Sequence, residues 1–183
     1  MDNLNLSFLK ENFKKTLQKT NKTKFLLAIS GGVDSMLLLK IATLIKNEES
    51  FNFRAIHINH NYSSNTEKME KHCSDICHEY SINLVIKNIN LLSDKNIEEQ
   101  LRNKRYESFF SDMYKDEVLV LAHHEDDQFE TFLYRLFRGA SPRGLSSIKE
   151  ISQRKNKILC RPFLKVPKKN IIELSRYFKL KFI

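Results

Sequence analysis

Two short segments of the sequence contain residue types that bind phosphate and metal ions. The first is Ser30-Gly31-Gly32-Val33-Asp34-Ser35, which joins an apolar run of strand length to a strongly apolar helical pattern. A strand that ends in glycines directly before a helix gathers backbone N–H groups at the positive end of the helix dipole. The glycines let an oxyanion approach the backbone, and the serine hydroxyls can donate further hydrogen bonds. Residues 30–35 therefore predict a phosphate-binding loop.

Asp34 needs a separate explanation, because a carboxylate does not bind a phosphate directly. Its place in the loop is accounted for if a Mg²⁺ ion lies between the carboxylate and the phosphates of a nucleotide, as in other nucleotide sites. The alternative is purely steric, since tight strand-to-helix turns also use glycine without binding any ligand. The full hexapeptide favours the phosphate site over that alternative.

The second segment, residues 122–131, places two histidines and several carboxylates directly after another apolar run. The carboxyl ends of parallel strands form the binding crevice of an open α/β sheet. If the two strands are neighbours, Asp34 and Asp127 emerge side by side and can hold Mg²⁺ together, with His123 at the nucleotide. Metal ligation by His123 and His124 is the alternative. It is disfavoured because adjacent residues at a strand end point in different directions and no third nitrogen or sulfur ligand is suitably spaced.

Apolar runs of strand length alternate with longer helical patterns along the chain, which is typical of parallel strands joined by crossover helices. The runs predict strands at 24–30, 53–59, 82–86, 118–122 and 157–160. Helical patterns are predicted around residues 6–17 and at 33–46, 97–114, 127–138 and 167–177, with one more after Ser64, whose spacing to Glu67 is that of a capping box. We predict an α/β fold with a doubly wound parallel five-stranded sheet, order 3-2-1-4-5, and helices on both faces.

The helix at 127–138 has one apolar and one polar face. Phe129, Phe132, Leu133 and Leu136 recur at helical spacing, so we expect that face to pack against the body of the protein. The opposite face carries two arginines, which could serve the site or form ion pairs with carboxylates of the same helix. These are Arg135 and Arg138.

Composition limits the class of protein. With 183 residues, of which 41% are hydrophobic, the chain is the size of one domain with a single core. No run reaches the length of a membrane span and no signal-peptide core is present, so we predict a cytoplasmic protein. The three cysteines include no Cys-x-x-Cys pair, and Cys73 and Cys77 have the spacing of core positions on a helix.

The net charge of +9 is concentrated near the end of the chain. Residues 149–181 contain eleven Lys or Arg and two Glu, so this stretch carries the whole excess. Such a stretch can bind phosphate backbones of a nucleic acid, or it can form an ordinary solvated face. The charge alone leaves both interpretations open.

The hexapeptide 30–35 resembles the signature of the ATP pyrophosphatase, or PP-loop, family, whose members cleave ATP between its α- and β-phosphates and transfer AMP. It is not a Walker loop, because no Gly-x-x-x-x-Gly-Lys motif is present. Further segments resemble, in the right order, the tRNA(Ile)-lysidine synthase family within the PP-loop enzymes. These segments are 57–60 (His-Ile-Asn-His), 102–106 (Arg-Asn-Lys-Arg-Tyr), 122–139, 144–145 and 161–164 (Arg-Pro-Phe-Leu).

The resemblance implies an adenine nucleotide alpha hydrolase-like fold and the use of ATP and Mg²⁺. It also implies adenylation of the C2 carbonyl oxygen of the wobble cytidine of an isoleucine tRNA, after which the amine of free lysine displaces AMP. Asp34 and Asp127 would bind Mg²⁺. Arg102 and Arg105 would reach phosphates or tRNA, the alternative being two solvated surface arginines. The segment that contains His57 and Asn59 would border the adenosine.

Members of this family continue with a further active-site segment and with C-terminal tRNA-binding domains. This chain ends at Ile183, so we expect residues 1–183 to be a single PP-loop ATP-binding catalytic domain without those domains. Two other functions stay open. One is a tRNA thiolase of the same superfamily, which would need paired Cys-x-x-Cys motifs for an iron–sulfur cluster. The other is a nucleotide-binding module without catalysis. The sequence also leaves open whether the chain forms a homodimer.

Overall fold

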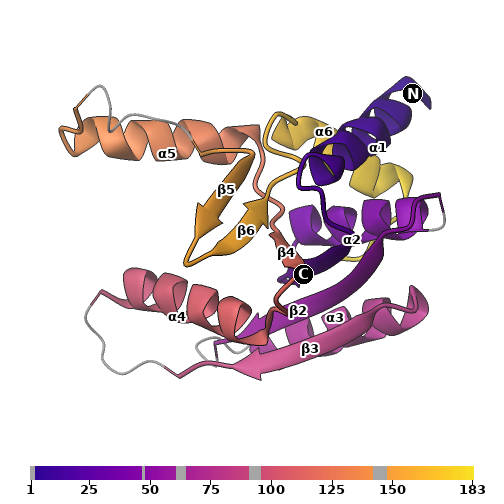
Figure 1. Ribbon diagram of the computed structural model, residues 1–183, viewed down its shortest axis with the longest axis horizontal. Coiled ribbons are helices and arrows are strands. Elements are labelled where there is room, and N and C mark those ends of the chain that lie inside the picture. The colour runs from indigo at the N-terminus through magenta and orange to yellow at the C-terminus, as the bar shows by residue number, and fades with distance from the viewer. Residues whose placement is uncertain (1–2, 47, 61–64, 91–95, 142–147) are drawn as a thin grey trace.

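The computed structural model describes residues 3–46, 48–60, 65–90, 96–141 and 148–183. Within these residues six strands form one sheet of order β3-β2-β1-β4-β6-β5 (Figure 1). The strands are β1 (Lys24–Ile29), β2 (Asn52–Asn59), β3 (Asn83–Asn88), β4 (Glu117–Val120), β5 (Ile151–Arg154) and β6 (Lys157–Cys160). All neighbours are parallel except β5 and β6. The predicted strand order is confirmed, with β6 as the predicted fifth strand.

Strand β5 was not predicted, so the sheet is mixed and not wholly parallel. It pairs antiparallel with β6 through a two-residue turn at Lys155 and Asn156, whose φ angles are 48° and 60°. Two successive positive φ values are the mark of the tight hairpin turns that match strand twist. The strand itself reads Ile-Ser-Gln-Arg, with a single strongly apolar residue. An edge strand of this kind lacks the apolar alternation from which a strand is predicted.

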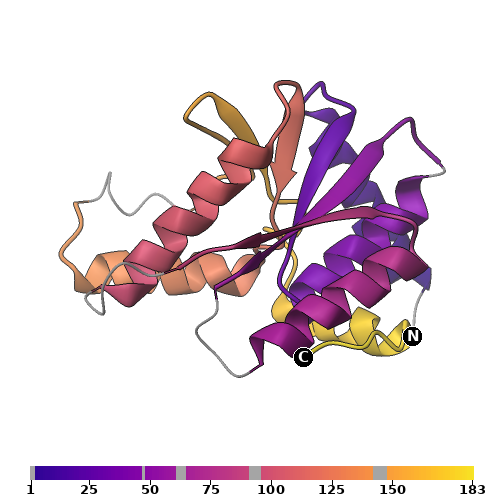
Figure 2. The same cartoon turned by 90° about the horizontal axis from the view of Figure 1, so that it is seen from below.

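The described residues form six helices, as predicted. They are α1 (Asn3–Gln18), α2 (Val33–Lys46), α3 (Thr66–Glu79), α4 (Ile97–Asp112), α5 (Glu125–Phe137) and α6 (Lys168–Tyr177). Side chains of α1, α2, α3 and α6 share one core with one face of the sheet, whereas α4 packs on the other face (Figures 1 and 2). Strand β1 alternates between the two, since Phe25 and Leu27 enter the first core and Leu26 the second.

Helix α5 differs from the prediction. Its apolar face was expected to pack, yet of its thirteen residues, all of them described, none is buried. Phe129 is 63% exposed and Phe137 83%. The helix extends away from the sheet (Figure 1), and its first turns are tied to the body by bonds from the Glu125 amide to the Val166 carbonyl and from the Gln128 side chain to the Leu164 carbonyl. Amphipathic spacing shows that a helix has an apolar face, but not what covers that face.

Arg54 of β2 joins two elements that are distant in the sequence. Its guanidinium donates two hydrogen bonds of 2.7 Å to the Glu117 carboxylate at the start of β4, and it also binds the Asp112 carboxylate at the end of α4. The Glu117 side chain is only 2% exposed. Such a bidentate, buried pair fixes the start of β4 against β2 and α4.

Two smaller predictions concern α3. Cys73 and Cys77 are buried in the first core, as predicted. Ser64, the predicted capping residue, lies outside the described residues, and α3 has Asn65 at its N-cap. None of the described helices is long and apolar enough to cross a membrane.

Candidate nucleotide-binding site

The loop between β1 and α2 is held by hydrogen bonds from its own serines. The Ser35 hydroxyl accepts a bond from the Ser30 amide (3.1 Å) and donates one to the Gly32 carbonyl (2.9 Å). Gly31 has φ +89°, a conformation that side chains with a Cβ rarely adopt. Ser35 was predicted as a phosphate donor, but its buried hydroxyl is engaged inside the loop. Its observed contribution is therefore to shape the turn.

One side of this loop is covered and the other is open. Gly31 is buried beside Met69 and Cys73 of α3, and its carbonyl accepts a 3.1 Å bond from the Ile183 amide. Ser30 is exposed, and residues 32–34 are half-buried. Ser30 and residues 32–34 are thus the part of the loop that is accessible to a ligand.

The two predicted carboxylates meet at a single histidine. Because β1 and β4 are parallel neighbours, α2 and α5 begin at the same edge of the sheet. The Nε2 atom of His124 lies 3.7 Å from Oδ1 of Asp34 and 3.6 Å from Oδ2 of Asp127. The predicted approach of Asp34 and Asp127 is therefore present in the structure. His124 was not predicted as a binding residue, although it directly precedes α5.

Asp127 also has a structural role at the start of α5. Its Oδ2 atom accepts a 2.8 Å hydrogen bond from the backbone amide of His124, the N-cap residue. A carboxylate at the third helical position that bonds back to the N-cap amide stabilises a helix start. This bond fixes the Asp127 side chain at the crevice while leaving its charge available to a cation.

Lys168, the first residue of α6, is a site residue that the sequence interpretation missed. Its ammonium forms an ion pair with Oδ1 of Asp34 and lies 3.5 Å from Nε2 of His124. Its backbone amide donates to Asp126 of α5 at 3.1 Å. One local signal could have indicated it: a lysine in the first turn of a helix lies at the positive end of the dipole and is favoured only if carboxylates from elsewhere compensate.

Burial lowers the pKa values of three histidines around the crevice, His57, His60 and His123. Burial, and after it the nearby Arg161 charge, lower the pKa of His123 to about 4, and Asp127 opposes these effects. Burial likewise lowers the pKa of His57, whose Nδ1 lies 3.1 Å from the Ile29 carbonyl of β1. Neutral imidazoles can accept or donate single hydrogen bonds to a polar ligand.

Asn59 is buried, whereas the two arginines of α4 are exposed. Asn59 is buried and its amide donates to Glu70 of α3 at 2.6 Å, so it links β2 to α3. Arg102 and Arg105 are exposed, but their charges lower the pKa values of His123 and His60, in each case after the larger effect of burial. Both arginine charges therefore act on histidines of the crevice. Tyr106, in the same segment of α4, is buried in the second core.

The arginines of α5 have local partners. The Arg138 guanidinium lies 4.3 Å from the centre of the Tyr134 ring on the same helix, which is a cation–π contact. This contact is neither the predicted ion pair nor a contact with the site. Arg135 also has an interaction partner within the protein.

Buried polar atoms without a hydrogen-bond partner collect around the same crevice. Seven such side-chain atoms occur among the described residues, and six of them lie at the carboxyl ends of β2, β4 and β6 or in the first turns of α5. These six belong to His57, His60, His123, His124, Gln128 and Arg161. Buried polar groups are normally paired, so a cluster of this kind is typical of a site for a polar ligand.

The residues present fit a magnesium ion that is shared with a phosphate ligand. Carboxylates of Asp34 and Asp127 approach the same point, and a cation, the Lys168 ammonium, already lies on Asp34. Among the described residues there is no cluster of three or more His, Cys, Asp or Glu arranged to hold a metal ion. Mg²⁺ commonly takes one or two carboxylates and completes its shell with phosphate oxygens and water, which two aspartates satisfy.

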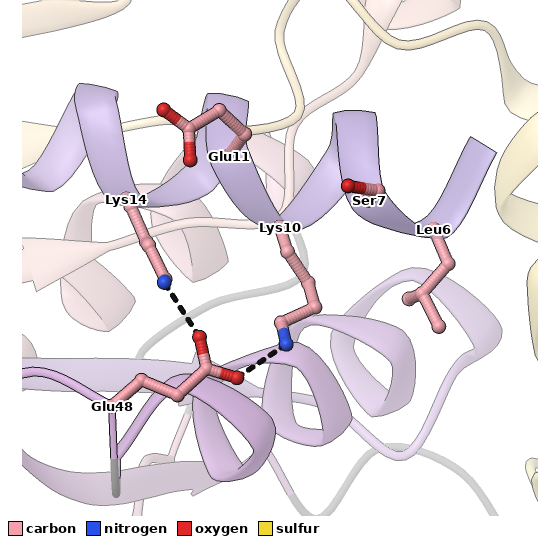
Figure 3. A pocket seen from close by; sticks show the side chains of 6 residues that line it. All are labelled: Leu6, Ser7, Lys10, Glu11, Lys14 and Glu48. Carbon is pink, nitrogen blue, oxygen red and sulfur yellow. Dashed lines mark hydrogen bonds and ion pairs between the residues drawn. The ribbon is translucent and has the colours of Figure 1, made fainter. Parts of the chain in front are cut away.

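A second hollow lies at the opposite end of α2. It is lined by Leu6, Ser7, Lys10, Glu11, Lys14 and Glu48 (Figure 3). Lys10 and Lys14 both bind the Glu48 carboxylate, and these two hydrogen bonds lower its pKa to about 2. The charges of the two lysines and Glu48 thus partly neutralise one another. These ion pairs join α1 to the segment after α2.

A β-strand that ends in a glycine turn at a helix start, with paired aspartates at the point where strand order reverses, defines an α/β nucleotide-binding protein. Comparison with known families is more specific, because residues 5–183 match the family described as "PP-loop domain". The chain belongs to this family.

The chain is similar in sequence to two known proteins and similar in fold to a solved structure. The chain is 42% identical over 159 residues to a tRNA(Ile)-lysidine synthase of Buchnera aphidicola subsp. Schizaphis graminum, which covers 86% of this chain and 36% of that protein. It is 41% identical to the tRNA(Ile)-lysidine synthase of Buchnera aphidicola subsp. Acyrthosiphon pisum, over 92% of this chain and 38% of that protein. The chain thus spans less than two fifths of their length. The U34-tRNA thiolase NcsA of Methanococcus maripaludis has the same fold, with a TM-score of 0.79 at 19% identity over 98% of this chain and 66% of that one.

Proposed function

We propose that this chain is the ATP-binding, adenylating domain of a tRNA(Ile)-lysidine synthase. In this reaction the C2 carbonyl oxygen of the wobble cytidine attacks the α-phosphate of ATP, and pyrophosphate leaves. The amine of free lysine then attacks C2, and AMP leaves with the oxygen. The substrates are ATP, lysine and isoleucine tRNA, and the proposal places the reaction in the cytoplasm.

The observation that carries this proposal is the meeting of Asp34 and Asp127 at His124, beside the PP-loop. Nucleotide transfer needs the triphosphate held in one orientation and its charge compensated as pyrophosphate departs. A loop at the start of α2 and carboxylates from α2 and α5 supply an anion site and a cation site within one crevice. The choice of tRNA and lysine as substrates is supported by the relatives named above.

Each site residue has a role in this proposal. The accessible residues of the loop 30–35 bind the phosphates, and Ser35 holds the shape of the loop. Asp34 and Asp127 would hold Mg²⁺, which would neutralise charge on the departing pyrophosphate. His57, Asn59 and His123 border the nucleotide and orient it. Arg102 and Arg105, on the exposed side of α4, bind tRNA or the pyrophosphate oxygens, for which a guanidinium is well suited.

The proposal is tested by incubating the purified chain with ATP, Mg²⁺, lysine and isoleucine tRNA. We expect pyrophosphate release that depends on tRNA, and a tRNA product that gains the mass of one lysine less water. Asp34→Asn should lower pyrophosphate release at least about 100-fold, the scale for removing one preorganised electrostatic group. Asp75→Asn, an exposed aspartate of α3, is the matched control and should have wild-type activity. Equal activity of the Asp34 variant would refute the metal role.

The two alternatives give different results in the same preparation. ATP binding in calorimetry, with no turnover in the presence of tRNA and lysine, would indicate a nucleotide-binding module. Iron in the purified protein would favour a thiolase. Cys73, Cys77 and Cys160 are buried and include no Cys-x-x-Cys pair, so we expect no iron.

A further inference from the structure

Lys168 lies where a cation is expected to act on the nucleotide. Its ammonium contacts Asp34 and approaches His124, while its backbone amide binds Asp126. These three partners come from α2 and from the start of α5, the two elements that carry the predicted metal ligands. The ammonium therefore lies on Asp34, one of the two predicted metal ligands.

The local setting of Lys168 is unfavourable without these partners. It is the first residue of α6, and the first turn of α6 contains no acidic residue. A cation at this end of a helix opposes the helix dipole, whereas α2 and α5 both begin with carboxylates. A residue that violates a local preference and is compensated only at a binding crevice is a candidate for function.

Asp34 cannot serve Lys168 and a metal ion equally. Both compete for the negative charge of one carboxylate, and Oδ1 is the atom that the ammonium contacts. The Lys168 and Asp34 side chains are each 29% exposed, so the ammonium has room to leave when another cation arrives. A long, flexible lysine side chain released at this point would lie next to the phosphates bound by residues 30–35.

We infer that Lys168 is a phosphate-binding residue that occupies Asp34 until ATP and its metal ion arrive. Without nucleotide, its ammonium neutralises Asp34 and weakens metal binding. With nucleotide bound, Asp34 would be free to hold the metal ion and the Lys168 ammonium would bind a phosphate oxygen. The inference rests on the proposed function and adds to it a residue and an order of events.

This exchange predicts effects of opposite sign for one substitution. Lys168→Gln removes the charge that competes with the metal, so nucleotide-free protein should bind Mn²⁺ about two- to fivefold more tightly, the range for a partly exposed ion pair. The same variant loses a charged phosphate partner, so ATP in the presence of Mg²⁺ should bind about tenfold more weakly. A purely structural role of Lys168 would weaken both or change neither.

The experiment measures free Mn²⁺ by electron paramagnetic resonance without nucleotide, and ATP binding with Mg²⁺ by calorimetry. The matched control is Lys169→Gln, which removes the same charge from the neighbouring exposed position and should change neither value. Lys168→Met is a second neutral variant in case the glutamine variant does not fold, and Lys168→Arg should retain ATP binding. Asp34→Asn should abolish the Mn²⁺ site in every background.

The outcomes separate this inference from the proposed function. If the wild-type protein binds Mn²⁺ and ATP but the Lys168 variants behave like Lys169→Gln, the role of Lys168 is wrong and the nucleotide site stands. Parallel weakening of both ligands also contradicts it. If the wild-type protein binds neither ligand, the proposed function and the inference fail together.

Discussion

At the level of single residues, Asp127 combines a structural and a chemical role. One of its oxygens accepts a hydrogen bond from the His124 backbone amide at the start of α5, and the same carboxylate faces the crevice. An asparagine can keep the hydrogen bond but not the charge, so substitution can separate the two roles.

We predict that Asp127→Asn retains stability and loses activity, whereas Asp127→Ala loses both. The alanine variant should be destabilised by about 1 kcal/mol, as for other lost helix caps. Urea unfolding measures the first effect and pyrophosphate release the second. An asparagine variant with wild-type release would show that the carboxylate charge is not needed.

At the level of elements, α4 and α5 both have apolar faces, but only α4 buries one. Phe109 of α4 is 4% exposed, whereas Phe137 of α5 is 83% exposed. The stability of the domain should therefore depend on the first side chain and not on the second.

We predict that Phe109→Ala lowers the free energy of unfolding by about 3–5 kcal/mol, because a buried ring leaves a cavity. Phe137→Ala should change it by less than about 0.5 kcal/mol. Chemical denaturation of the two variants provides the comparison. A large loss for the Phe137 variant would mean that α5 packs against protein in solution.

The ion pairs of Arg54 join β2 to β4 and α4. Replacing Arg54 with Met leaves the Glu117 carboxylate buried without its bidentate partner, so we expect a loss of about 3–5 kcal/mol. The double variant Arg54→Met with Glu117→Gln should recover part of this loss, because it removes the unpaired charge. Denaturation midpoints of the wild type and the two variants test this coupling, and equal losses in the single and double variants would contradict it.

At the level of the whole molecule, several of the basic side chains that make up the excess positive charge form bonds within the domain. In the basic stretch 149–181, Arg161 is buried and bonds the Lys149 carbonyl at 2.8 Å, and Lys157 bonds the Met113 carbonyl at 3.0 Å. Lys168 binds Asp34. Several cations that the sequence suggested for a nucleic-acid surface therefore have partners inside the domain.

The buried histidines make the stability of the molecule depend on pH. His123 has a pKa of about 4 in the folded protein, mainly through burial, against about 6.5 when unfolded. The unfolded chain thus takes up this proton first as pH falls. The stability from neutral His123 is complete above about pH 6.5 and is lost progressively towards pH 4.

We predict a falling free energy of unfolding between pH 7 and 5, by at most about 1.4 kcal/mol per pH unit for each such histidine. The pKa values of His57 and His60 are also lowered, mainly by burial, and act in the same direction. Urea titrations at several pH values measure the slope. His123→Asn should flatten it, whereas His78→Asn, at an exposed position of α3, should not. An unchanged slope in the His123 variant would contradict the assignment.

Much of the fold and part of the site could be predicted from local patterns. Helix α2 and strand β6 have the predicted bounds, and the carboxyl ends of β1 and β4 meet as the strand order requires. These predictions succeed because apolar period, glycine at a turn and the rules for parallel crossovers act over short stretches of chain. The loop at 30–35 and the approach of Asp34 and Asp127 follow from the same rules.

Other features depend on contacts between distant segments. Lys168 reaches Asp34 across 134 positions of sequence, Ser35 bonds within its own loop, and α5 leaves its apolar face uncovered. No local period encodes which surface a helix meets, or which carboxylate neutralises a lysine, because both depend on how α2, α5 and α6 are placed together. The sequence thus predicted a nucleotide crevice, and tertiary packing decided which charges share it.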